Sequence, residues 1–194
     1  GSFFSTVDFD PLGTARLSAI GGSDAFILKL DSSGIFLWVR RFGGTAYESV
    51  NSVTTDEQGN VYAIGWFSNT VDFDPGPGTF TLSSSTETTF ILKLDSSGNF
   101  IWARKLDGTS DGRSIKLDKS GNIYCSGFYS STVDFDPSTT GTYNLSSNGN
   151  QDIYYLKLTN SGNFIWAKTI GGTDNESAFS LYVNDSGWVY SAGY

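Results

Sequence analysis

Carboxylates are the most regularly spaced reactive groups of this chain. The motif Val-Asp-Phe-Asp-Pro occurs three times and supplies six aspartates, namely Asp8, Asp10, Asp72, Asp74, Asp134 and Asp136. Carboxylate oxygens are the ligands that calcium prefers, so these six residues are candidate metal ligands. The alternative is structural, because Val and Phe would share one face of a strand while the second Asp of each motif caps the turn that proline begins. Capping is the favoured interpretation, so no cofactor is required and calcium remains the alternative.

The connections that follow these motifs predict where a ligand would bind. They run from residues 10 to 24, 74 to 88 and 136 to 152, whereas the other turns are short. Long loops often carry function. Glu48 and Glu176 each precede another strand and should lie on the same side of the fold as these loops. The ligand-face candidates are therefore Asp10, Asp74, Asp136, Glu48 and Glu176.

The same carboxylates argue against an enzyme. Glu48 and Glu176 occupy matching places in a repeat, and a carboxylate pair can hydrolyse glycosidic bonds. Catalysis usually needs two carboxylates in unlike environments, whereas repeated residues fall into like ones. The chain has no histidine, which removes Ser-His and Cys-His pairs and histidine-ligated zinc. Its one cysteine, Cys125, aligns with Ala63 and Ser191, as a small buried strand residue would. We therefore predict no catalytic residue and no enzymatic activity.

The whole chain consists of three copies of one unit. With Gly1 and Ser2 set aside as a cloning scar, the copies span residues 3–66, 67–128 and 129–194 and form one continuous domain. The end of the chain runs into its start, because VYSAGY followed by FFSTVDFD has the pattern of VYAIGWFSNTVDFD in the middle. The Gly-Ser start and the whole-repeat length favour an engineered or trimmed chain.

Each copy is predicted to form four short strands. Apolar alternation with β-branched or aromatic residues marks residues 89–94, 100–106, 114–118 and 123–128. Asp-Ser-Ser-Gly and its variants join the strands as tight turns, in which Asp bonds forward and Gly takes a positive φ. The result is a four-stranded antiparallel meander. Such meanders repeated around an axis form the blades of an all-β propeller.

Aromatic and basic residues recur within these strands. Trp38, Trp102 and Trp166 align, and we expect them to pack between blades, since each ring buries a large area. A lysine also recurs in mid-strand, where its alkyl stem can cover apolar surface while the ammonium stays in water.

Three segments carry a resemblance to a known family. They are DAFILKLDSSGIFLWV at residues 24–39, GGT at 43–45 and DEQGNVYAIG at 56–65. They resemble the SBBP β-propeller repeat family of bacterial surface and secreted proteins, and the resemblance extends over essentially the whole chain. It implies a propeller fold and a secreted or cell-surface location, and says little about activity. The middle copy departs from the pattern, with Asp107 in the first glycine position and Thr88 where the others have aspartate.

The chain starts inside one unit, so one of its three blades is predicted to be split between the termini. The third and fourth strands of that blade lie at residues 25–42, and its first and second strands at 179–194. Propellers typically have about four to eight blades, so three blades cannot surround a channel. Half-built sheets leave open edges and an apolar face. We expect the chain to bind itself, as a six-bladed homodimer in preference to a nine-bladed homotrimer, through clasp residues Phe26, Leu28, Leu30, Tyr182, Tyr190 and Tyr194.

Composition narrows the remaining partners. The net charge is −8 with no basic block, so nucleic acid is not an expected partner. No apolar stretch approaches the ~20 residues that span a bilayer, so no membrane insertion is expected, and no signal peptide is visible. The expected function is a non-enzymatic scaffold that also binds an unidentified protein or glycan. The alternative is a carbohydrate-binding or calcium-dependent adhesion domain of a bacterial surface protein.

Overall fold

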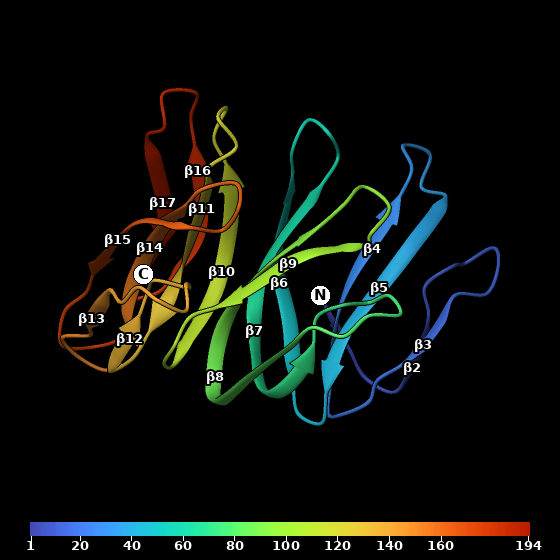
Figure 1. The fold of residues 1–194 in the computed structure, drawn as a ribbon, viewed down its shortest axis with the longest axis horizontal. Helices are drawn as coiled ribbons and strands as arrows, with labels where there is room; N and C mark the ends of the chain where they lie inside the picture. The colour runs from blue at the N-terminus through green and yellow to red at the C-terminus, as the bar shows by residue number, and fades with distance from the viewer.

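The computed structural model describes all 194 residues, and every regular element in it is a β-strand. All the strand pairs are antiparallel, which confirms the predicted all-β class. The sheets stand side by side in a row, with the first strands of the chain at one end and β16 and β17 at the other (Figure 1). Because the structure contains no helix, it has none long and apolar enough to cross a membrane.

The end of the first copy and the start of the second form a four-stranded run in the middle of the row. Its strands pair in chain order and are β6 (Glu48–Thr55), β7 (Val61–Asp72), β8 (Thr81–Leu94) and β9 (Phe100–Lys105). The two tight turns end on Gly59 and Gly98, whose φ angles of 79° and 80° are those that glycine favours. β8 starts earlier than the predicted residue 89, because residues 81–84 continue to pair with β7 and turn the long connection into a hairpin.

The end of the second copy and the start of the third repeat this order. Their four-stranded sheet consists of β10 (Ser110–Leu117), β11 (Ile123–Tyr129), β14 (Asp152–Leu158) and β15 (Phe164–Ile170). Between β11 and β14 the chain forms a small hairpin of β12 (Thr132–Asp134) and β13 (Asn144–Ser146). The meander predicted from the tight turns is therefore present in both complete sheets.

The two ends of the chain carry shorter sheets. At the amino end, β4 (Asp24–Leu30) pairs with β5 (Phe36–Gly44), and β1 (Ser2–Phe3) pairs only with the first two residues of β4. A small hairpin of β2 (Thr6–Asp8) and β3 (Arg16–Ser18) precedes them. At the carboxyl end, β16 (Ala178–Val183) and β17 (Val189–Gly193) form a two-stranded sheet by themselves. No strand pair joins β17 to β4, so the row of sheets is not closed into a ring.

The core lies between neighbouring sheets, as expected for repeats that bury their faces against one another. One cluster of 13 buried residues joins β4 and β5 to the sheet that begins with β6. Another cluster of 14 buried residues joins that sheet to the sheet that begins with β10. Trp38 and Trp102 pack against the edges of these clusters, which agrees with their predicted place between sheets.

Candidate functional site

The repeated aspartates hold their own loops in shape. In each motif the first aspartate accepts two backbone N–H bonds: Asp8 from Asp10 and Ala15, Asp72 from Asp74 and Phe80, and Asp134 from Asp136 and Tyr143, at 2.7–3.2 Å. The second aspartate accepts one, as in the 2.8 Å bond from the Gly76 N–H to Asp74. The two backbone bonds lower the pKa of Asp8. These contacts are the turn caps that the structural interpretation predicts.

The aspartates do not gather into a cation site. No group of three or more acidic, cysteine or histidine side chains comes close enough to hold a metal ion. Asp72 and Asp74 instead line a hollow of about 510 Å³, whose other walls carry Arg16, Arg40 and Arg41. A surface that carries both acidic and basic side chains suits a polar ligand better than a bare cation. Calcium binding at these loops stays a prediction.

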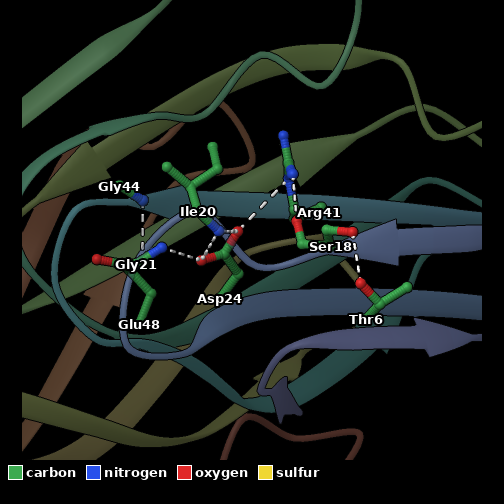
Figure 2. A network of polar contacts seen from close by, with 8 residues as sticks. All are labelled: Thr6, Ser18, Ile20, Gly21, Asp24, Arg41, Gly44 and Glu48. Carbon is green, nitrogen blue, oxygen red and sulfur yellow. Dashed lines mark hydrogen bonds and ion pairs between the residues drawn. The ribbon is translucent and has the colours of Figure 1, made fainter.

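Glu48 lies in a polar network with Gly44 and near Asp24 (Figure 2). One of its carboxylate oxygens accepts the Gly44 N–H at 3.1 Å, while the other is buried without a partner. Burial raises the pKa of Glu48 to about 7, and the nearby charge of Asp24 adds to the effect. Asp24 itself accepts N–H bonds from Ile20 and Gly21. Glu48 is thus a buried cap of the link between two sheets.

Glu176 caps the equivalent link near the carboxyl end. Its carboxylate accepts the Gly172 N–H at 2.9 Å, but the side chain is only half-buried. Glu48 is opposite Phe67 in the pairing of β6 with β7, whereas the pairing of β16 with β17 begins at Ala178 and puts no residue opposite Glu176. The two glutamates therefore make the same backbone contact in two different surroundings, and no geometry pairs them for hydrolysis.

Exposed aromatic residues distinguish the sheet of β16 and β17. Tyr190 is 55% exposed, whereas the residues at its place in the other copies, Tyr62 and Tyr124, are 0% and 3% exposed. Tyr182 and Tyr194 are exposed as well. The rings of Tyr182 and Tyr190 lie 6.2 Å apart, so they form one aromatic face. Phe179, which sequence reasoning did not single out, extends this face through a 5.5 Å contact with Tyr194.

The other predicted clasp residues lie on β4. Leu30 is 44% exposed, whereas Leu94 and Leu158 at the same place are fully buried. Phe26 and Leu28 are half-buried. All six predicted clasp residues thus lie on the two terminal sheets, but within one chain the structure does not bring the two groups together.

Phe179 could have been found from its alignment with Asn51 and Arg113. Only the third copy has an aromatic residue at this place, and Arg113 itself lies over the Phe179 ring at 6.0 Å. An apolar residue that replaces polar ones in a repeat is a signal of a changed neighbour.

Comparison with known proteins confirms the repeat. Residues 37–66 match the SBBP family model, described as a beta-propeller repeat. These residues run from β5 through β6 into β7, so they contain the link between two neighbouring sheets. The resemblance noted in the sequence is confirmed in this segment.

Two curated proteins are similar over most of the chain. One is an "Uncharacterized WD repeat-containing protein" of Acanthamoeba polyphaga mimivirus, 26% identical over 84% of this chain and 13% of its own length. The other is "Regulatory protein FlaEY" of Caulobacter vibrioides, 28% identical over 86% of this chain and 18% of its own length. The chain therefore spans less than a fifth of either relative.

Proposed function

We propose that this chain of propeller repeats is a non-enzymatic interaction scaffold, and that two copies close into a six-bladed ring by completing each other's split blades. The observation that carries the proposal is a pair of open strand edges at opposite ends of the row. β17 has no strand on the side away from β16, and β4 has none beyond its first residues on the side away from β5. Open edges with apolar side chains tend to pair with another chain.

The complete sheets supply a template for the pairing. In them the second and third strands pair Tyr62 with Lys93 and Ala63 with Leu92. Transferred to the ends of the chain, the same register places Tyr190 opposite Lys29 of the partner subunit, and Ser191 opposite Leu28. We call this pairing of β17 with β4 of the partner subunit the joint. Every residue of the joint has a counterpart in the two complete sheets of the same chain.

A lysine–tyrosine contact would be part of the joint. The Lys93 ammonium lies 4.7 Å from the centre of the Tyr62 ring, and the Lys157 ammonium lies 4.6 Å from that of Tyr124. Lys29 has no tyrosine within its own chain, and its ammonium lies 6.0 Å from the Trp38 ring. The partner's Tyr190 supplies the missing ring, and a cation–π contact of this kind contributes about 0.5–2 kcal/mol.

Burial of the exposed side chains drives the association. Each large apolar residue that passes from water into a sheet interface stabilises the complex by about 1.5–3 kcal/mol. Tyr190 and Leu30 are half-exposed or nearly so in the single chain and occur twice in a twofold ring. Head-to-tail contacts that close produce rings, and two chains give a blade number within the common range of about four to eight, whereas three give nine.

The first residues of the chain compete for the same edge. Ser2 pairs with Ala25 just as Trp66 pairs with Thr89, and in the proposed register this is also the place of the partner's Tyr194. Gly1 accepts the Phe26 N–H at 2.9 Å. Gly1 and Ser2 must therefore leave β4 before the partner's β17 can pair along its full length.

We also propose that the chain is not an enzyme, because its candidate catalytic residues lack the chemistry that catalysis needs. The chain contains no histidine. Burial raises the pKa of the Cys125 thiol, so it stays protonated, and Glu48 and Glu176 both serve as caps. A glycan that stacks on the exposed tyrosines is the rival ligand of the same surface.

Light scattering across a concentration series tests the proposal. We expect a species of twice the 21.0 kDa mass of one chain at micromolar concentration. A single-chain mass at every concentration would refute the ring, and loss of the dimer on addition of an oligosaccharide would assign the tyrosines to a glycan.

A further inference from the structure

We propose that β15 is a second contact surface, separate from the edge of β17, and that it binds the Val7-Asp8-Phe9 segment and the Asp31–Ile35 turn of a second copy. This inference rests on the proposed ring, but it concerns contacts between neighbouring blades rather than strands within one blade. It also assigns a contact to the first Val-Asp-Phe-Asp motif, which takes no part in the proposed pairing of β17 with β4.

Within the chain, the second and third motifs each pair with the end of the preceding sheet. The end of β5 pairs with the motif strand of the second copy, Gly43 with Asp72 and Gly44 with Val71. The ring of Phe42 then lies 6.3 Å from that of Phe73 and is buried.

The next sheet is fastened in the same way. Asp107, which follows β9, exchanges two backbone hydrogen bonds of 2.8 and 3.3 Å with Asp134 of the third motif. Leu106 is fully buried in the same core cluster as Val133 and Phe135. The last apolar residue of each of these outer strands is thus covered by the motif of the following copy.

β15 ends on the corresponding residue without a cover. Ile170 is 61% exposed, whereas Phe42 and Leu106 at the same place are 1% and 0% exposed. The first motif shows the complementary defect: Val7 and Phe9 are only half-buried, whereas the Val and Phe of the other two motifs are fully buried. One chain therefore holds an outer strand without a motif and a motif without an outer strand.

A tight turn makes a second contact between neighbouring sheets. The turn that joins β8 to β9 lies against β5, where the Trp38 indole N–H and the Lys29 ammonium donate to the Ser96 carbonyl at 3.3 and 2.8 Å. Arg40 donates to the carbonyls of Ser97 and Gly98, both at 2.9 Å.

The equivalent turn of the third copy lies against β9. The Lys93 ammonium donates to the Asn160 side chain at 2.6 Å. A methyl group added at Gly162 would lie 3.3 Å from the Trp102 ring, so the turn lies directly on this tryptophan.

The turn of the first copy has no such neighbour. No atom lies within 4 Å of a methyl group added at Gly34, whereas the equivalent Gly98 and Gly162 both contact a tryptophan. Trp166 on β15 is the tryptophan that lacks a turn, and Lys168 beside it is exposed. Both halves of the turn contact are thus present at opposite ends of one chain, which identifies a second copy of this chain as the occupant.

Replacing Ile170 tests the inference. In the full chain, Ile170→Ser should leave the denaturant midpoint of dilute monomer unchanged, because the side chain is already exposed. Each lost contact should weaken association by about 30-fold, the loss expected for an isoleucine that stays in water, and the twofold ring contains the contact twice, so the dimer should weaken by about 1,000-fold. The matched variant Leu106→Ser removes a buried side chain, so it should lower the midpoint of the monomer itself. Val7→Ser should weaken association as well, and the double variant should lose less than the two single losses combined.

The outcomes separate this inference from the ring. If the parent chain is monomeric at every concentration, the proposed ring fails and this inference fails with it. If the parent chain dimerises and Ile170→Ser dimerises with the same dissociation constant, the contact on β15 is refuted while the strand joint stands. A lowered midpoint of Ile170→Ser monomer would also refute it, because Ile170 would then already be covered within its own chain.

Discussion

The two complete sheets and the half-sheets at the two ends are built from the same repeated residues, yet they differ in burial. Tyr62 and Tyr124 are buried under a neighbouring lysine strand, and Tyr190 at the same place is exposed because that strand is absent. Side-chain type and local strand geometry are equal in the three cases. The comparison teaches that in this fold burial is set by the neighbouring strand, so an exposed copy of a buried residue marks a missing neighbour.

The largest difference is expected for matched leucines. Leu94 is fully buried, so Leu94→Ala should lower the free energy of unfolding by about 2–5 kcal/mol. Leu30→Ala should lower the stability of the dilute monomer by less than about 1 kcal/mol, because the side chain is already 44% exposed, but it should weaken association. Urea unfolding at two protein concentrations measures both effects. Equal losses in dilute monomer would mean that Leu30 is buried within its own chain.

The matched glutamates predict a pH effect. The pKa of Glu48 is raised to about 7 by burial, so the folded chain holds a proton that the unfolded chain releases from about pH 4.5. The stability that this group contributes is complete below pH 4.5 and is lost as the pH rises to 7, by about 2–3 kcal/mol.

Substitution isolates this contribution. Burial also raises the pKa of Asp111 to about 7, so Glu48→Gln should reduce the fall in stability between pH 4.5 and 7 without abolishing it, whereas Glu176→Gln, at the half-buried position, should leave the fall unchanged. Thermal unfolding at fixed ionic strength measures the profiles. A parent profile without this fall, or one that Glu48→Gln leaves intact, would contradict the burial of an ionisable carboxyl group.

A smaller effect is expected at the edge of β4. Deleting Gly1 and Ser2 removes the two hydrogen bonds between Gly1 and Phe26 and frees the place of the partner's Tyr194, so association should tighten by about fivefold to tenfold. Burial lowers the pKa of the Gly1 amine to about 6, so docking of Gly1 weakens as the pH falls from 8 to 6. The parent dimer should therefore tighten over that range and the deleted chain should not. Sedimentation equilibrium measures both, and a weaker dimer after deletion would contradict the competition.

The smallest effect concerns the aspartate caps. Asp74 accepts the Gly76 N–H at 2.8 Å and Asp10 accepts the Leu12 N–H at 3.1 Å, so replacing either by alanine should cost about 1 kcal/mol. The loss should be the same with calcium, with magnesium and with neither. A thermal shift specific to calcium that disappears in Asp74→Ala would instead support the calcium-dependent adhesion domain.

Much of this architecture can be predicted from the sequence because its signals are local. Asp-Ser-Ser-Gly fixes the tight turns, apolar alternation fixes the strands, and the proline after each Val-Asp-Phe-Asp motif marks the capped loop. The start of β8 at Thr81 is missed because residues 81–84 form a strand only by pairing with β7. The burial of Glu48 is missed for a similar reason, since it depends on Phe67 and Asp24 from other strands.

The exposed Ile170 illustrates the same limit at the site. Its place in the repeat predicts a buried residue, and only the structure shows that no motif covers it. Alignment of the copies gives the position, while the missing neighbour requires three-dimensional information.

Disulfide trapping across the joint tests the central claim most directly. In a Cys125→Ala background, one chain carries Ser191→Cys and the other Leu28→Cys, which the register of Ala63 with Leu92 places opposite each other. Mixing the two under mild oxidation should give a covalent dimer of twice the 21.0 kDa chain mass. Ile27→Cys is the matched control, because adjacent strand residues point to opposite faces and cannot bridge. A covalent product of equal yield with Ile27→Cys, or none with Leu28→Cys, would contradict the completion of one chain's sheet by the other.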